Sequence, residues 1–183
     1  MRIVRQIYQL KITLGEVYPP VWRRVQIPGG YTLDRVHRVI QHAMGWMNVH
    51  LHSFDVAGVQ YGEPDPEGEL SVRDELDTRL DSVASDGSRF TYTYDFGDWW
   101  EHRVDVERVF IADPDERYPR CVGGEWACPP EDVGGAFGYS SLLSALADPA
   151  HPSHDDSVDW VGDGFDPATF RADVATTLLR RMA

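Results

Sequence analysis

Alternating apolar and polar positions near the start of the chain predict a β-hairpin. Apolar residues alternate with polar ones over 8–14 and again over 21–27. This period of two is typical of strands that have one buried face and one solvated face. The segment from Gly15 to Pro20 supplies the turn, and Pro28-Gly29-Gly30 ends the second strand. The two strands are expected to pair in antiparallel fashion.

Helical spacing follows this hairpin. Apolar residues recur every three or four positions over 33–45, Thr32 is a good N-cap, and Gly45 marks the end. Farther along, the pattern predicts strands over 50–56, 90–94 and 104–108, an ordered or metal-tied loop over 123–138, and helices over 139–147 and from Asp166 onward. The last helix is expected to begin with Pro167 in its first turn and to bury Phe170, Val174 and Leu178.

These elements indicate an α+β fold: a single compact domain over 1–183, with a mainly antiparallel sheet, a helix after the N-terminal hairpin and a C-terminal helix. Nine acidic residues and two prolines over 63–88 indicate an acidic loop, although some apolar residues there predict partial packing. Hydrophobic residues make up 42% of the chain and charged residues 26%, which is ordinary for a globular protein. No apolar stretch is long enough to span a membrane and no secretory leader is visible, so we expect a cytoplasmic protein.

Charge is distributed unevenly along the chain. The formal net charge is −13, but residues 1–62 carry seven basic and three acidic residues, for a net +4. The rest of the chain carries −17. An acidic surface of this strength repels nucleic-acid phosphates over most of the molecule.

Several strings of sequence resemble one family. They are Pro-Pro-Val-Trp-Arg-Arg-Val (19–25), the run from Leu33 to Trp46, His-Leu-His-Ser-Phe (50–54), the run from Tyr92 to His102, Tyr-Pro-Arg-Cys (118–121) and the run from Cys128 to Gly135. The chain resembles the plasmid pRiA Orf-three-like family, whose members also travel as passengers of an insertion element under the label TnpR. The resemblance implies an association with mobile DNA. One departure concerns Val133, where many members have a third cysteine.

Two groups of ionisable residues follow predicted strand boundaries. Asp98, Glu101 and His102 come just after a strand that breaks at Gly97, where they could act as acid–base groups or metal ligands. In the structural alternative, Asp95 and Asp98 cap a turn. His50 and His52 are two residues apart, so that on a strand both rings would project to one face and supply half of a metal site. The alternative is that one caps the preceding helix and the other packs on Trp46.

The segment around the two cysteines is stiffened by proline and glycine. Cys121 and Cys128 have six residues between them, which is wider than a zinc knuckle. We expect a reduced, packed pair within one loop region, with zinc ligation assisted by a residue such as His102 as the weaker alternative. Glu131 and Asp132 lie on the same constrained loop, where they could hold a ligand.

Arg23 shares the apolar face of its strand, which predicts a buried structural ion pair to an acid of 95–101. Alternatively, the Arg23-Arg24 pair beside an aromatic ring is a nucleic-acid contact.

The sequence supports three functional hypotheses. The leading one is a non-enzymatic binding or accessory module of mobile-element origin, in which His50 or His52, Asp98, His102 and Glu131 or Asp132 form one polar cleft for a small molecule or a partner protein. The alternative is a small metal-dependent hydrolase, with a divalent metal held by His50, His52, Asp98, His102 and Asp132. A third is a nucleic-acid-binding accessory protein that uses the basic N-terminal third.

The charge distribution makes one prediction about DNA. We expect no tight non-specific duplex binding at physiological salt, because the acidic part of the chain repels phosphate. A titration with random-sequence duplex at several salt concentrations measures this. Micromolar or tighter affinity that falls steeply with added salt would contradict the expectation.

Overall fold

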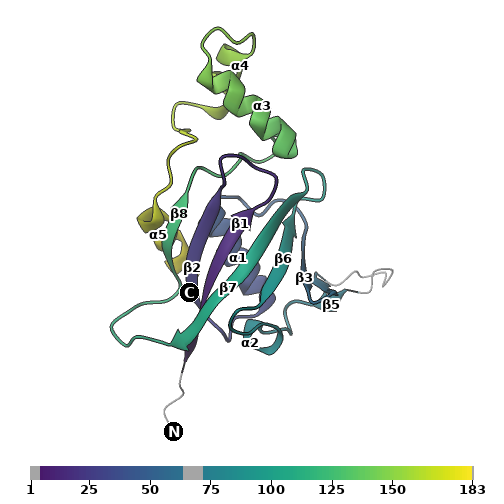
Figure 1. The fold of residues 1–183 in the computed structure, drawn as a ribbon, viewed down its shortest axis with the longest axis vertical. Coiled ribbons are helices and arrows are strands. Elements are labelled where there is room, and N and C mark those ends of the chain that lie inside the picture. Colours follow the sequence, from purple (N-terminus) through teal and green to yellow (C-terminus); the bar gives the residue numbers. More distant parts are fainter. Residues whose placement is uncertain (1–4, 64–71, 183) are drawn as a thin grey trace.

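The computed structural model describes residues 5–63 and 72–182, and its centre is one eight-stranded sheet (Figure 1). The strand order is β5-β4-β3-β6-β7-β1-β2-β8, and every pairing is antiparallel except that of β4 with β5. The strands are β1 (Gln6–Leu14), β2 (Trp22–Pro28), β3 (His52–Val56), β4 (Val59–Gly62), β5 (Arg73–Asp74), β6 (Arg89–Tyr94), β7 (Trp100–Ile111) and β8 (Arg120–Glu125). The helices are α1 (Leu33–Met44), α2 (Leu80–Val83), α3 (Gly135–Ala147), α4 (His154–Val161) and α5 (Ala172–Arg180). The α+β class and the mainly antiparallel sheet are confirmed.

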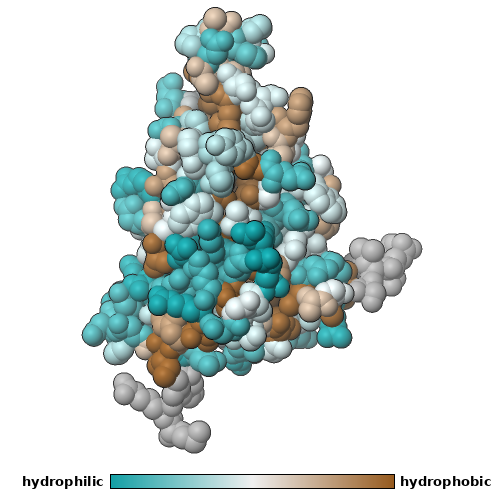
Figure 2. Space-filling model, in the orientation of Figure 1, coloured by the Kyte–Doolittle hydropathy of each residue, from teal (hydrophilic) through white to brown (hydrophobic). Residues whose placement is uncertain are grey.

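The predicted hairpin is present as β1 and β2. Their register pairs Tyr8 with Ile27 and Thr13 with Trp22, and β1 also pairs with β7, so it lies inside the sheet. Period-two alternation buries Leu10, Ile12 and Leu14 on one face. Hydrophilic residues gather on the opposite face, which remains open (Figure 2), and there Arg24 forms a bidentate pair with Glu107 at 2.7 Å.

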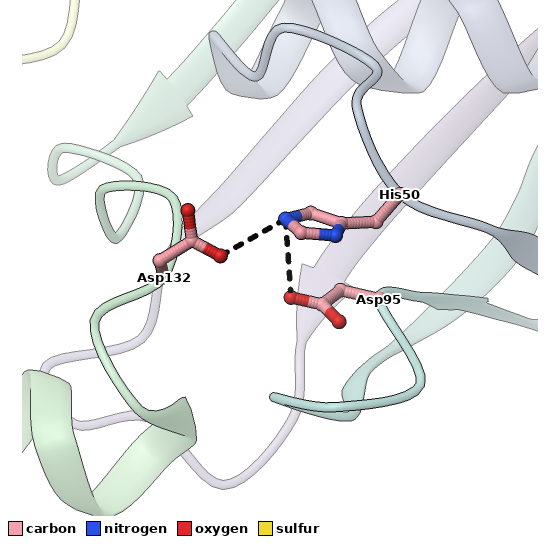
Figure 3. A group of neighbouring side chains, drawn as sticks. All are labelled: His50, Asp95 and Asp132. Atoms are coloured by element: carbon pink, nitrogen blue, oxygen red, sulfur yellow. Dashed lines mark ion pairs between the residues drawn. The ribbon is translucent and has the colours of Figure 1, made fainter.

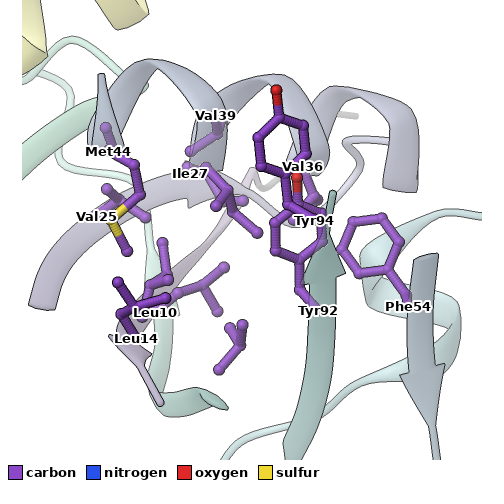
Figure 4. Packing of buried hydrophobic residues seen from close by; sticks show 14 of the residues in the cluster. Leu10, Leu14, Val25, Ile27, Val36, Val39, Met44, Phe54, Tyr92 and Tyr94 are labelled. Atoms are coloured by element: carbon purple, nitrogen blue, oxygen red, sulfur yellow. The ribbon is translucent and has the colours of Figure 1, made fainter. Parts of the chain in front are cut away.

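The helix α1 covers the apolar face of the sheet (Figures 1 and 4). It buries Val36, Val39 and Ile40 completely, against inward side chains of the central strands. Gly45 ends α1 in the left-handed conformation at φ 105°, where a residue without a Cβ is favoured. Thr32 is the N-cap as predicted, but its hydroxyl bonds to the Asp34 carboxylate and not to a helix N–H.

Two loops predicted from composition contain regular structure. Part of the acidic loop at 63–88 lies outside the described residues, but its remainder holds β5, α2 and a buried Glu75. The segment 123–138 is not one loop, because β8 runs to Glu125 and α3 begins at Gly135. Glycines at 123 and 124 gave no strand signal, yet this stretch pairs with β2 opposite Arg24 and Arg23.

The predicted start of the C-terminal helix is wrong. The Asp166 carboxylate accepts bonds from the Ala168 N–H (2.9 Å) and the Thr169 hydroxyl (2.6 Å), which makes an isolated turn, and α5 begins only at Ala172. The buried stripe of α5 also differs from the predicted one. Ala175 and Leu179 are buried, whereas Val174 is 45% exposed. The helix α4 was not predicted, and none of its residues is buried.

α3 and α4 lie beyond one end of the sheet, while α5 packs beside α1 and the edge strand β8 (Figure 1). No helix in the described parts of the chain is long and apolar enough to cross a membrane. The core therefore lies between one sheet face and the α1–α5 layer, and the loops at the α3 end of the sheet are left to form a site.

The segment that precedes α5 packs closely against β8 at Gly124. A Cβ at this position would lie 2.4 Å from a Phe170 ring carbon and 2.8 Å from the Trp22 carbonyl oxygen. Gly124→Ala should therefore lower the free energy of unfolding by about 1–3 kcal/mol, measured by urea denaturation. Gly164→Ala is the matched control, because nothing lies within 4 Å of its Cβ position. Equal stability of the two variants would contradict this packing.

Candidate functional site

Three separate chain segments meet at the α3 end of the sheet. Because β3 and β6 are antiparallel, with His52 opposite Tyr94, the start of one strand lies beside the end of the other. This pairing places His50, just before β3, next to Asp95, just after β6, and the Asp95 N–H donates to the Leu51 carbonyl at 2.9 Å. The third segment is the loop between β8 and α3, which carries Glu131 and Asp132.

The imidazole of His50 lies between carboxylates from both other segments (Figure 3). Its Nε2 atom is 3.1 Å from Asp132 Oδ1, 3.6 Å from Asp95 Oδ2 and 3.9 Å from Glu131 Oε2. Potential ligand atoms of His50, Asp95 and Asp132 all lie within 4.8 Å of one another. That spacing is compatible with one ion bound at ordinary ligand distances.

Two polar atoms in this group are buried without a hydrogen bond. They are His50 Nε2 and Glu131 Oε2, and the close carboxylates around His50 do not have hydrogen-bond geometry toward it. Buried polar atoms are nearly always paired, so an unpaired nitrogen beside an unpaired carboxylate oxygen indicates a site for a bound group. A divalent cation would satisfy both atoms.

Glu131 is held in place through its other oxygen. Oε1 accepts bonds from the Met47 N–H (2.9 Å) and the Tyr94 hydroxyl (3.1 Å). Burial, with the nearby Glu131 charge, raises the pKa of Tyr94 to about 12, so the phenol keeps its proton and donates it. The orientation of Glu131 is thus fixed before any ligand arrives.

Backbone conformation aims the other two carboxylates. Asp95 and Asp132 have φ values of +56° and +58°, in the left-handed region that disfavours most residues but tolerates aspartate. At Asp95 the Gly97 N–H donates to Oδ1 at 2.8 Å, which leaves Oδ2 facing His50.

The sequence-predicted polar cluster is only partly assembled. His50, Glu131 and Asp132 come together as expected, but His52, Asp98 and His102 lie elsewhere. The carboxylate of Asp98 accepts the Gly134 N–H at 3.0 Å, so that it anchors the Glu131–Asp132 loop from outside the group. Asp95 caps the turn through the Gly97 N–H, as the structural alternative predicts, and its other carboxylate oxygen takes the strand-end position expected for Asp98.

His52 belongs to a second polar cluster under α1. Its Nε2 is 2.8 Å from Glu75, and its ring stacks on that of His37 with centroids 3.5 Å apart. His37 Nε2 donates to Asn48, and Nδ1 accepts the Tyr92 hydroxyl proton at 2.8 Å. Burial lowers the pKa of His37 to about 3, so this ring is neutral near pH 7. Every polar atom named here has a partner, as expected for a structural network.

His102 lies wholly inside the core. Its ring meets that of Trp46 edge-on, and Nδ1 donates to the Tyr92 carbonyl at 3.3 Å, while Nε2 has no hydrogen-bond partner. It is fully buried and does not belong to the group around His50. His102 is therefore a core residue on the inner face of β7, and the sequence pattern alone does not distinguish such a histidine from one in a functional site.

Arg23 is buried as predicted, but the expected ion pair to residues 95–101 is wrong. The guanidinium instead donates to the carbonyls of Ala43, Trp22 and Glu125 at 2.8–2.9 Å. It also stacks over the Phe170 ring at 3.8 Å.

The cysteines do not share one loop. Cys121 is on β8 and donates its thiol to the Gly123 carbonyl at 3.3 Å, whereas Cys128 precedes the proline pair; both are free thiols. Neither belongs to the group of potential ligands around His50.

A cavity of about 820 Å³ adjoins the site, and Glu131 and Asp132 form part of its wall. The rest of the wall comes from Arg23 on β2, the end of α1 with the residues after it, residues 127–130, the end of α4, the Phe165–Phe170 segment and α5. The cluster of His50 and carboxylates is therefore placed at the edge of a space large enough for a small organic molecule.

Comparison with known proteins identifies the family. Residues 6–174 match the family described as "Plasmid pRiA4b ORF-3-like protein". The chain belongs to this family. An "Uncharacterized protein y4hQ" from Sinorhizobium fredii is 43% identical over 162 residues, which cover 87% of this chain and 83% of that protein. The crystal structure of a "Protein of Unknown Function MM3350" from Methanosarcina mazei Go1 superposes with a TM-score of 0.86 at 33% identity, covering 93% and 97% of the two chains. The family resemblance inferred from the motifs is confirmed.

The burial of His102 predicts a pH dependence of stability. Burial lowers its pKa to about 4 from the ordinary 6.5, so below pH 6.5 the unfolded chain binds the proton first. Stability is then complete above pH 6.5 and is lost as the pH falls toward 4. His102 alone should cost about 2 kcal/mol between pH 7 and pH 5.

Urea denaturation at both pH values measures this loss. His102→Met should remove that part of the pH dependence, whereas His151→Met, outside the core, should leave it. An unchanged difference between pH 7 and pH 5 in His102→Met would show that the ring does not titrate as stated.

Proposed function

We propose that this protein is a binding module that holds a divalent cation between His50, Asp95 and Asp132, with Glu131 as an additional donor. The cleft beside this cation holds a small ligand. The observation that carries this proposal is a pair of buried atoms without a hydrogen bond, His50 Nε2 and Glu131 Oε2, which lie 3.9 Å apart. The carboxylates of Asp132 and Asp95 lie within ion-pair distance of the same nitrogen.

The donor set limits the class of cation. One imidazole with several carboxylates suits borderline and hard divalent ions such as Zn²⁺ and Mn²⁺, whereas sites for soft ions use thiolates. The acidic surroundings favour a cation, since the chain carries −13 overall. Mn²⁺ and Zn²⁺ are therefore suitable probes.

A binding role is better supported than hydrolysis. Of the five residues expected for a metal-dependent hydrolase, only His50 and Asp132 meet, and His102 is sealed in the core. The family's plasmid association is consistent with an accessory role for a mobile element.

Isothermal titration of EDTA-treated protein with Mn²⁺ and with Zn²⁺ tests the proposal. Wild type should bind one ion per chain, and Asp95→Asn should weaken binding at least about tenfold, because a charged ligand is lost. Asparagine tolerates the left-handed backbone at 95, so the variant should fold.

Asp98→Asn is the matched control. It removes the same charge three residues away, and its amide oxygen can still accept the Gly134 N–H. Binding in this variant should equal that of wild type. No binding of either ion by wild type, or equal weakening in both variants, would overturn the proposal.

A further inference from the structure

The 820 Å³ cavity combines an apolar lining with one buried cation. The apolar wall includes Met44, Trp46, Trp160, Phe165, Phe170 and Val174. Arg23 also lines the cavity, although the residue is only 1% exposed. This is an unusual surrounding for a guanidinium, which never loses its charge in proteins.

The charge of Arg23 has no anionic partner within the described residues. Its hydrogen bonds go to three backbone carbonyls, and no described carboxylate lies within 4.0 Å of it. Its ionisable neighbours are the Cys121 and Cys128 thiols and the Tyr139 phenol. Burial raises the pKa of both thiols and raises that of Tyr139 to about 12, so all three are neutral near pH 7.

An unpaired buried charge is costly and is normally compensated by an opposite charge. Carbonyl dipoles and the Phe170 ring reduce that cost at Arg23 but bring no net negative charge. The field of the guanidinium therefore favours an anion inside a space where water is partly displaced by apolar walls.

We propose that this cavity binds a small organic anion with an apolar body, of the class represented by medium-chain carboxylates. The acid group lies on the Arg23 side, and the apolar part packs against Trp46, Phe165 and Val174. Glu131 and Asp132, which also line the cavity, repel the acid group and so favour its placement nearest to Arg23. This inference goes beyond cation binding and does not rest on it, because Arg23 is outside the His50 group.

The wild-type protein tests the charge preference directly. Decanoate and decyltrimethylammonium, below their micellar concentrations, and decanol, below its solubility limit, are titrated into EDTA-treated full-length protein. Binding is followed by calorimetry and tryptophan fluorescence. Decanoate should bind at least about tenfold more tightly than decanol, since one unpaired charge is satisfied, and the ammonium compound should bind most weakly. Decanoate binding no tighter than decanol, or absent, would overturn the proposal.

Three variants locate the site. Val174→Trp should fill the cavity and abolish binding of decanoate, whereas Val122→Trp, at a similarly exposed position on β8 outside the cavity, should not. Arg23→Met should bring decanoate and decanol to equal affinity. If Arg23→Met does not fold, the wild-type ligand series and the Val174→Trp variant still test the proposal. Undiminished binding of decanoate by Val174→Trp would show that this cavity is not the binding site.

Discussion

The antiparallel pairing of β3 with β6 is the constraint on which both polar clusters depend. It fixes two tyrosines, Tyr92 and Tyr94, on the inner face of β6, and each hydroxyl organises one cluster. Tyr92 joins His37 and Gln41 beneath α1, while Tyr94 holds Glu131 and the Val49 N–H at the strand end. A shift of one residue in this register would turn both rings to the open face of the sheet. The strand pairing thus sets the chemistry of the site as well as the fold.

Some buried polar groups have all their hydrogen bonds and others do not. The first kind belongs to the structural framework, and the second kind includes the candidate site. The His37–Asn48–Tyr92 network pairs its atoms, and so it stabilises one arrangement of α1 on the sheet. His50 and Glu131 each leave an atom unpaired beside the other. His102 shows that an unpaired atom alone does not make a site, because its ring is enclosed by Trp46 and Tyr92 and no described cavity reaches it. Convergence with other ligand atoms is what distinguishes His50.

The sequence predicted the fold well where periodicity was strong. The β1–β2 hairpin, α1 and β6 followed from alternation and helical spacing, because a core selects one face of each element. It failed where local polar bonds decided the outcome, as at Asp166, whose carboxylate closes a turn in place of capping a helix. The glycines of β8 failed for a similar reason, since pairing with β2 and not propensity makes that segment a strand.

The candidate site was predictable in part. The stiff loop with Glu131 and Asp132 and the antiparallel meeting of His50 with a strand end were both visible. The sequence did not show which acidic residue after the strand faces inward, because the left-handed backbone at Asp95 turns that carboxylate toward His50. The period-two rule also placed His50 and His52 on one face, but β3 begins only at His52. His50 therefore lies outside the strand, where the alternation of side chains does not apply, and its ring turns toward the loop that carries Glu131 and Asp132.

The two proposed sites share a wall, which couples them physically. Glu131 and Asp132 belong both to the surroundings of His50 and to the lining of the large cavity. A bound cation neutralises these carboxylates, and that change reduces their repulsion of an anion in the cavity. By thermodynamic linkage the anion must strengthen cation binding by the same factor. In the two proposals together, an acidic protein accepts an anionic ligand because the charge of Arg23 attracts the acid group and the cation offsets the charges of Glu131 and Asp132.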